Sequence, residues 1–140
     1  MSMMMINTKM KTNHSVRVRY AETDQMGIVY YGNYAQYFEV GRVELLRECG
    51  MSYREMENSG VMLPVVHLEV NYKKSALYDE LLTIETEVVE KPTVKIIFNH
   101  KIYNEKRELL VIGKVILVFM DIETRKIKKA PSEILEAFGY

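Results

Sequence analysis

Asp24 is the side chain of this sequence best placed to act on a carbonyl group. It follows a segment in which apolar and charged residues alternate, and a loop rich in glycine, apolar and tyrosine residues separates it from an amphipathic segment that begins near Asn33. A carboxylate can attack a carbonyl carbon as a nucleophile, or it can activate water as a general base. The position of Asp24 between a strand and a helix therefore makes it a candidate for acyl chemistry by either route, although an aspartate after a strand is more often an N-cap or a solvated turn residue.

The start of the helix could stabilise the negative charge that develops in such a reaction. Asn33 is predicted to be the N-cap residue, with Gln36 as its capping-box partner. The first N–H groups of a helix have no partner within the helix, and the helix dipole places partial positive charge beside them. Gly27 and Gly32 suit the preceding loop, because glycine permits positive φ and close approach of the backbone to a substrate.

A long helix over residues 34–49 is predicted to position this site. Its apolar and small residues recur at helical spacing and share one face, which is formed by Tyr34, Tyr37, Phe38, Gly41, Leu45 and Cys49. Gly41 lies in the middle of that face, where glycine costs about 1 kcal/mol relative to alanine. We therefore expect a crossing sheet to approach the helix closely at Gly41. Gly50 is expected to end the helix.

The chain is expected to form one domain over residues 13–140, preceded by a flexible tail over residues 1–12. The domain opens with a predicted strand over residues 14–22, because apolar residues alternate there with arginines. The buried face of that strand would be formed by Val16, Val18 and Tyr20.

Mostly strands are predicted after the long helix. A short helix over residues 53–59 is predicted from a capping box between Ser52 and Glu55. Pro131 is expected at the first position of a terminal helix. Strands are expected over residues 61–72, 81–90, 94–102 and 109–120. Strands grouped after one long helix predict an α+β fold, with a largely antiparallel sheet and the helix packed on one of its faces.

Composition excludes several classes of function. The 140 residues carry 19 basic and 19 acidic side chains, so no positive surplus favours nucleic acid, and no net charge opposes self-association. The single cysteine fits a reducing compartment, and no apolar run is long enough to span a membrane. No residues have the spacing of metal ligands. We therefore expect a cytoplasmic protein with no cofactor, no metal and no membrane or nucleic-acid partner.

The segment from Asp24 to Tyr34 resembles the motif of a known enzyme family. It reads Asp-x-x-Gly-x-Val-Tyr-Tyr-x-x-Tyr, and in its context of strand, helix and antiparallel strands it is similar to the 4-hydroxybenzoyl-CoA thioesterase family of hotdog-fold acyl-CoA thioesterases. Ser75 stands where that family has proline, so the strand bend can differ there. Weaker similarity continues over residues 70–76, 78–80 and 130–134. The matching residues are Asp24, Gly27, Val29, Tyr30, Tyr31, Asn33, Tyr34, Phe38, Glu39, Arg42, Glu44 and Leu45.

This resemblance implies the hotdog fold, an antiparallel sheet wrapped around a central helix, and hydrolysis of an acyl-CoA thioester to a carboxylic acid and free CoA. Asp24 would be the nucleophile or the general base, and the backbone amide of Tyr31 would polarise the thioester carbonyl. Coenzyme A would be part of the substrate. Two chains would join edge to edge as a homodimer, with active sites at their interface, or as a homotetramer. Whether both halves of one site come from the same chain is left open.

Further residues are candidates for contact with the substrate. Those around the motif, together with one strand histidine, are Gly27, Val29, Tyr30, Gly32, Asn33 and His67. Lysines near two turns could contact the phosphates of CoA, namely Lys73, Lys74, Lys91 and Lys95. The acyl group stays open among aromatic, short aliphatic and hydroxynaphthoyl groups.

Two other functions are compatible with the same fold. A hotdog hydratase or dehydratase would need an Asp/His or His/Glu pair, but Val29 stands five residues after Asp24 and no histidine occurs between residues 16 and 66. A non-catalytic module would bind acyl-CoA without hydrolysing it.

Overall fold

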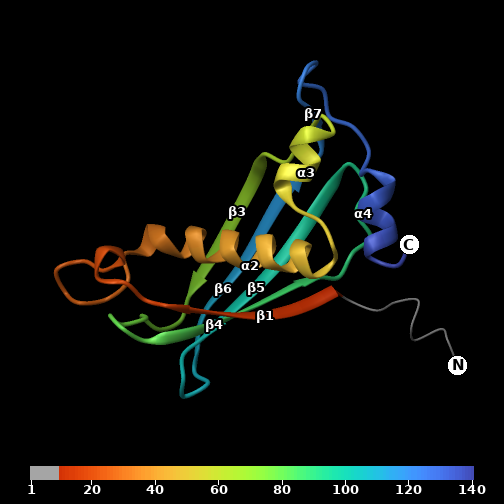
Figure 1. Cartoon of the computed structure of the whole chain (residues 1–140). Helices are drawn as coiled ribbons and strands as arrows, with labels where there is room; N and C mark the ends of the chain where they lie inside the picture. The colour runs from red at the N-terminus through yellow and green to blue at the C-terminus, as the bar shows by residue number, and fades with distance from the viewer. Residues whose placement is uncertain (1–9) are drawn as a thin grey trace, which may run out of the picture.

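The computed structural model describes residues 10–140 and has the predicted α+β arrangement. One long helix, α2 (Tyr34–Glu48), lies across one face of a five-stranded sheet (Figure 1). The strand order is β1-β4-β5-β6-β3, and every neighbouring pair is antiparallel. The strands are β1 (Met10–Arg17), β3 (Val65–Tyr72), β4 (Leu81–Val88), β5 (Lys95–Tyr103) and β6 (Leu109–Val118).

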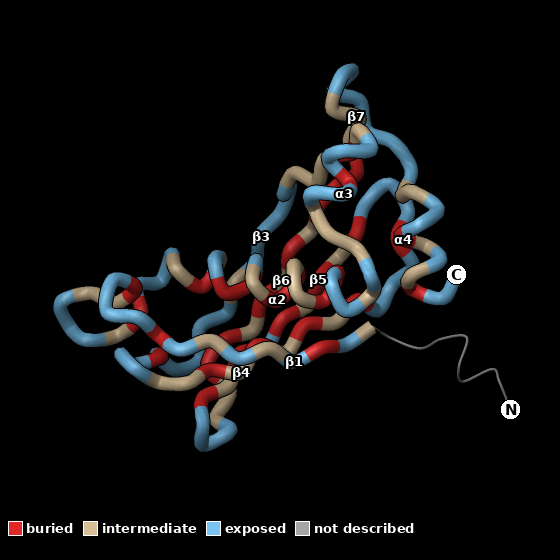
Figure 2. The backbone as a smooth tube through the Cα atoms, viewed as in Figure 1, coloured by how far each residue is buried: buried red, intermediate tan, exposed pale blue. Residues whose placement is uncertain are grey.

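The predicted apolar face of α2 is confirmed. The side chains of Tyr34, Tyr37, Phe38 and Leu45 are buried, and Cys49 packs against the edge of the same core. This face rests mainly on β1, β4 and β5, and the buried segments gather where helix and sheet meet (Figure 2). Gly50 has a φ of +84° just after the helix, as expected of a residue that ends it.

The helix crosses the sheet over one row of paired residues that runs through all five strands. In sheet order, this row is Thr12, Thr86, His100, Gly113 and Val70. A Cβ atom on Gly41 would lie 2.3 Å from Thr86 Oγ1, and one on Gly113 would lie 2.3 Å from Phe38 Cζ. Both glycines therefore let α2 approach the sheet closely, which confirms the prediction for Gly41 and adds Gly113, which the sequence did not single out.

The first strand differs from its prediction at both ends. It begins at Met10, so residues 10–12 belong to the sheet, and the rest of the predicted tail lies outside the described residues. It ends at Arg17, and the chain turns through a 3₁₀ helix, η1 (Tyr20–Glu22). Val18 is buried as predicted, but Tyr20 is 78% exposed because this turn breaks the strand alternation.

The smaller elements follow their local signals. Helix α3 (Tyr53–Asn58) is capped as predicted, because Ser52 Oγ accepts a hydrogen bond from Glu55 N at 3.1 Å. The predicted strand over residues 61–72 is divided near Pro64 into β2 (Val61–Met62), which pairs with β7 (Met120–Asp121), and β3. Helix α4 (Ser132–Ala137) begins one residue after Pro131, which precedes the helix instead of starting it.

His100 is a buried histidine beneath α2. It is 1% exposed, its ring stacks on Phe38 at 4.8 Å between centroids, and its Nδ1 lies 2.9 Å from Thr86 Oγ1. Its Nε2 has no hydrogen-bond partner within residues 10–140. Burial, with a smaller contribution from the positive charge of Arg42, lowers the pKa of His100 from 6.5 to about 3.

We predict that His100 makes the protein less stable in acid. The unfolded chain binds a proton at His100 below pH 6.5, whereas the folded chain does so only near pH 3. Between these values the unfolded state binds more protons, so the free energy of unfolding falls as the pH falls, by at most roughly 1.4 kcal/mol per pH unit from this group. Urea unfolding across this window, compared with His100→Phe, measures the contribution. Equal pH slopes for the two proteins would contradict it.

Candidate active site

Asp24 lies in a tight turn that holds its backbone and one carboxylate oxygen. Asp24 N donates to Ile28 O at 2.9 Å, and Gly27 N donates to Asp24 O at 3.0 Å. Gly27 has a φ of +80°, the left-handed position that closes a three-residue loop of this kind. Asp24 Oδ1 accepts from Met26 N at 2.8 Å. The other carboxylate oxygen, Oδ2, makes no hydrogen bond to the described part of the chain and is free to meet a substrate.

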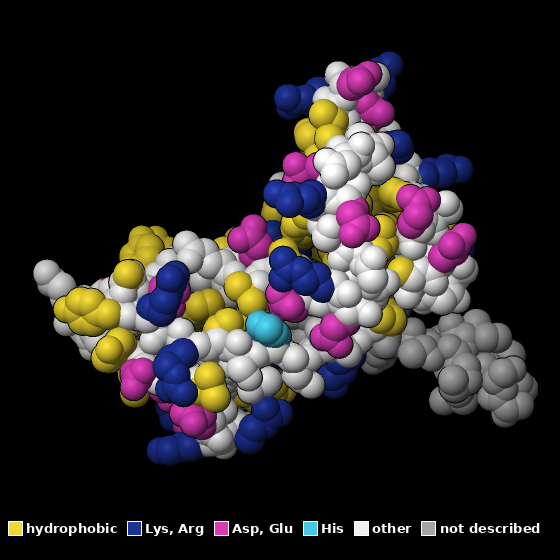
Figure 3. Space-filling model, viewed as in Figure 1, with side chains coloured by type: hydrophobic (Ala, Val, Ile, Leu, Met, Phe, Trp, Pro, Cys, Tyr) yellow, Lys and Arg dark blue, Asp and Glu magenta, His cyan; other side chains and the backbone are white. Residues whose placement is uncertain are grey.

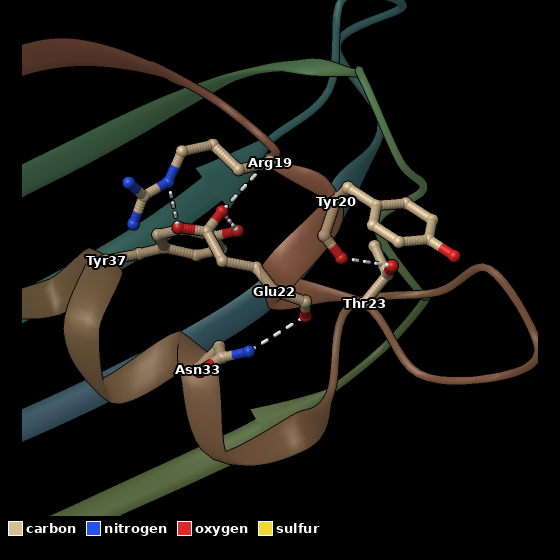
Figure 4. A network of polar contacts seen from close by, with 6 residues as sticks. All are labelled: Arg19, Tyr20, Glu22, Thr23, Asn33 and Tyr37. Carbon is tan, nitrogen blue, oxygen red and sulfur yellow. Dashed lines mark hydrogen bonds and ion pairs between the residues drawn. The ribbon is translucent and has the colours of Figure 1, made fainter.

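Just before this turn, the buried side chain of Glu22 forms a polar cluster with the exposed Arg19 and the buried Tyr37 that the sequence did not reveal (Figure 4). Its side chain accepts hydrogen bonds from Arg19 N at 2.9 Å, Arg19 Nε at 3.0 Å and Tyr37 OH at 2.8 Å. Burial on its own raises the pKa of Glu22, but these three hydrogen bonds outweigh it and hold that pKa below its usual range. Burial and the hydrogen bond to Glu22 raise the pKa of Tyr37. Glu22 therefore stays ionised at neutral pH.

The backbone of Glu22 also fixes the start of the helix. Its carbonyl oxygen accepts from Tyr30 N at 2.9 Å and from Asn33 Nδ2 at 2.8 Å. Asn33 is the residue before α2 as predicted, but its side chain does not cap the helix, because it points back to this carbonyl. The predicted capping box with Gln36 is thus absent, and a 3₁₀ turn, η2 (Tyr31–Asn33), leads into α2.

Tyr31 begins η2, so its amide is one of the unpaired donors at the start of a helix. Within residues 10–140, neither Tyr31 N–H nor Gly32 N–H donates a hydrogen bond. The carbonyl of Tyr31 accepts from Tyr72 OH at 3.3 Å, which ties η2 to the end of β3. Two backbone donors beside the helix N-terminus are therefore available to an oxygen atom.

Asp24 and Tyr31 border the same open cleft of about 360 Å³. The cleft lies between the turn, the start of α2 and the end of β3. Its other lining residues are Met26, Ile28, Val29, Tyr34, Tyr72, Lys73, Lys74 and Ser75. One chain thus brings Asp24 and Tyr31 to one cleft, and the roles expected of them from the sequence stay predictions.

The tip of the molecule beside this cleft is strongly apolar on its surface. Figure 3 shows hydrophobic side chains gathered at the end formed by the loop between β1 and α2. The exposed apolar residues of this loop are Tyr20, Met26, Tyr30 and Tyr31. The rings of Tyr30 and Tyr31 pack together at 4.6 Å between centroids. The entrance to the cleft is therefore suited to contact with uncharged parts of a ligand.

The predicted contact residues near the motif are placed in different ways. Val29 borders the cleft but is only 3% exposed, since its side chain belongs mainly to the core. Gly27 shapes the turn, and Tyr30, Gly32 and Asn33 flank Tyr31 without bordering the cleft themselves. Their contacts with a substrate stay predictions.

His67 does not border the Asp24 cleft. Val70 pairs with Gly113, which faces the helix, so His67, three residues earlier on β3, faces the opposite side of the sheet. There His67 Nε2 lies 3.0 Å from Glu69 Oε1. The strand bulge between Val65 and His67 shifts the alternation of side chains, which the sequence does not disclose.

The four candidate lysines separate into two pairs. Lys73 and Lys74 border the cleft, and Lys74 is held by an ion pair with Glu108. Lys91 and Lys95 lie in a separate hollow near the start of β5, and the chain does not bring them to Asp24. Contact of Lys73 or Lys74 with CoA phosphates stays a prediction.

The described residues offer neither a metal site nor a membrane-spanning helix. Residues 10–140 contain no group of three or more histidine, cysteine, aspartate or glutamate side chains that could hold a metal ion. In the same range, no helix is long and apolar enough to cross a membrane.

Comparison with known proteins places this geometry in a family. Residues 18–138 match the thioesterase-like superfamily. The chain is 38% identical over 123 residues to the putative acyl-CoA thioesterase YneP of Bacillus subtilis, covering 88% of this chain and 86% of that protein. It is 31% identical over 123 residues to the acyl-CoA thioester hydrolase YbgC of Escherichia coli, covering 88% and 92%.

The fold agrees with these relatives. The DHNA-CoA thioesterase of Staphylococcus aureus superimposes with a TM-score of 0.87 at 37% identity, over 91% of this chain and 88% of that one. The hotdog fold predicted from the motif, with its sheet around a central helix, is thereby confirmed. A match over most of its length and a shared fold show that this chain belongs to the thioesterase-like superfamily.

Proposed function

We propose that this protein hydrolyses acyl-CoA thioesters to a carboxylic acid and free CoA. The observation that carries the proposal is that Asp24 and Tyr31 border one cleft, and that the Tyr31 amide has no hydrogen-bond acceptor within residues 10–140. The names of the relatives agree with it, since the proteins of Bacillus subtilis, Escherichia coli and Staphylococcus aureus are all named as enzymes acting on CoA thioesters.

The Tyr31 amide is proposed to bind the carbonyl oxygen of the thioester. As the carbonyl carbon is attacked, negative charge collects on this oxygen, and a donor already aimed at it is worth about 2.7–4 kcal/mol, as for other oxyanion holes. The partial positive charge at the start of α2 acts in the same direction.

Asp24 is proposed to carry out the attack through its free Oδ2. As a nucleophile, it forms a mixed anhydride with the acyl group, the C–S bond breaks, and CoA leaves as the thiolate; water then hydrolyses the anhydride. As a general base, it takes a proton from water while the water oxygen forms the new C–O bond and the C–S bond breaks. Both routes give the same products and use the same cleft.

Two alternative functions remain to be distinguished from hydrolysis. The positions of the histidines bear on a hydratase or dehydratase, and an assay of turnover bears on a non-catalytic acyl-CoA-binding module. None of the three histidines borders the cleft: His14 lies on β1, His67 faces away from the helix, and His100 is buried. A hydratase that relies on an Asp/His pair therefore finds no support here. A module that binds acyl-CoA without hydrolysing it would have the same cleft, so turnover must decide.

A homodimer formed through β3 is proposed as the working unit. Within residues 10–140, β3 is an edge strand that pairs only with β6, and its helix-facing side chains Leu68 and Tyr72 are about half exposed. An open apolar edge of this kind favours pairing with another strand. A two-fold axis makes the pairing of identical strands antiparallel, so the Val65 end of one copy lies beside the Tyr72 end of the other. Each cleft would then be bordered by both chains.

Asp24→Asn tests the reaction. We expect a fall in kcat of at least about 100-fold, because asparagine can still accept the Met26 amide but is neither a nucleophile nor a base of useful strength. The assay is release of free thiol from benzoyl-CoA, short aliphatic acyl-CoAs and a hydroxynaphthoyl-CoA. Asp79→Asn is the matched control, since Asp79 is exposed and has a φ of 68° that asparagine tolerates. Full activity of Asp24→Asn would refute the proposal, and binding without turnover by the wild type would favour the module.

Leu68→Lys tests the dimer. A charge on the exposed apolar face of β3 should separate the copies, so light scattering should give a mass near the 16.4 kDa of one chain, whereas the wild type gives two or four times that mass. Asn13→Lys, on the edge strand β1 at the other side of the sheet, is the control and should leave the mass unchanged. A wild type that is monomeric at assay concentrations would exclude the dimer.

A further inference from the structure

Glu22 is a buried carboxylate that the proposed reaction does not use. It is 8% exposed, and its side chain is the acceptor for Arg19 N, Arg19 Nε and Tyr37 OH. Burying an ionised carboxylate is costly unless it is well hydrogen-bonded. Stability alone does not explain why this loop next to the cleft contains a hydrogen-bonded carboxylate, because apolar side chains could fill the same volume.

Glu22 holds the backbone on both sides of the Tyr31 amide. The carbonyl oxygen of Glu22 accepts hydrogen bonds from Tyr30 N–H and from the side chain of Asn33. Tyr30 and Asn33 flank Tyr31 and Gly32, whose amides are the first two of η2. Between these two hydrogen bonds, the N–H groups of Tyr31 and Gly32 have no acceptor within residues 10–140, and the backbone that carries them is held on both sides. The Glu22 side chain bonds Tyr37, one helical turn further on, so η2 and the first turn of α2 are fastened to one residue.

Glu22 also constrains Asp24, which is only two residues further along the chain. Thr23, between them, is itself fixed, because its N–H and its hydroxyl both donate to Tyr20 O, at 3.1 and 2.7 Å. Thr23 also pairs with Val29 as an isolated β-bridge. The chain from Glu22 to Asp24 therefore has little freedom, and the placement of the Asp24 carboxylate relative to α2 depends on where Glu22 is held.

We propose that Glu22 is a positioning residue that sets the separation between the Asp24 carboxylate and the Tyr31 amide. The inference rests on the proposed hydrolysis, in which both groups must meet the same thioester carbonyl. Reacting groups must be held closely for such a step, and a misplacement of about 1 Å can cost about a hundredfold in rate. The carboxylate suits this role because it only accepts hydrogen bonds, and its three partners are all donors.

Two variants weaken the hydrogen bonds of the Glu22 side chain without changing a residue that borders the cleft. Tyr37→Phe removes one of the three donors and keeps the ring in the core. Glu22→Gln keeps the shape of the side chain but turns an NH₂ group toward a donor. Tyr53→Phe is the matched control, because Tyr53 OH accepts from Arg42 Nε at 3.0 Å far from Asp24, so it also loses one partly buried tyrosine hydroxyl.

The expected result is a fall in kcat of about tenfold or more for Glu22→Gln and Tyr37→Phe, with KM for the acyl-CoA changed less than about threefold, because positioning acts on the chemical step. Tyr53→Phe should lose a similar amount of thermal stability and keep its kcat. Equal kcat for Tyr37→Phe and Tyr53→Phe at equal loss of stability would overturn the inference.

Hydrogen–deuterium exchange of the unliganded proteins separates this inference from the proposed function, since it needs no activity. Amides of residues 23–33 should exchange faster in Glu22→Gln and Tyr37→Phe than in the wild type and in Tyr53→Phe, while the amides of β4 to β6 stay equally protected. Unchanged exchange of residues 23–33 in both variants would overturn the positioning role even if the protein is a thioesterase. Faster exchange would support that role even if no acyl-CoA tested is hydrolysed.

Discussion

The close crossing of α2 over the sheet is the constraint on which the rest of the structure depends. Gly41 allows the helix to lie against Thr86, and Gly113 accepts the ring of Phe38 in the same row. A side chain at either glycine would push the helix away by overlap of atoms, not by a small loss of packing. The position of the first turn of α2 relative to the strands follows from this contact, so the site at that end of the helix inherits its geometry from the core.

The loop that carries Asp24 is joined to this framework through Glu22. The core fixes Tyr37, Tyr37 holds the Glu22 side chain, and the Glu22 backbone holds Tyr30 and Asn33 around the free amides. The carboxylate and the amides are therefore positioned by the folded chain before a substrate arrives, which is what electrostatic stabilisation of a developing oxyanion requires. The hotdog fold thus sets the position of the helix N-terminus, and the local polar contacts set the position of the loop that carries Asp24.

Features with a local signal could be predicted from the sequence, and features that depend on partners distant in the chain could not. Gly41 lies on a clear apolar helix face, and Ser52 and Glu55 form a recognisable cap, so the sequence predicts both the close helix–sheet contact and the start of α3. Glu22 was missed because it lies in a short turn without periodicity, and Tyr37 is fifteen residues away. Its spacing of three residues from Arg19 was the one available signal. Residue type alone predicts substrate contacts for His67, Lys91 and Lys95. Within one chain, however, the sheet face of His67 and the position of the two lysines near the start of β5 place them away from Asp24.

Binding of the thioester carbonyl oxygen by the Tyr31 amide can be observed most directly at the proton of that amide. In ¹⁵N-labelled Asp24→Asn protein, bound acyl-CoA should not be consumed, and spectra with and without it can be compared. A new hydrogen bond should move the Tyr31 amide proton downfield, by more than that of Tyr30, which already donates to Glu22 O. An unchanged chemical shift of the Tyr31 amide proton, while the signals of other cleft residues move, would contradict binding of the carbonyl oxygen by this amide.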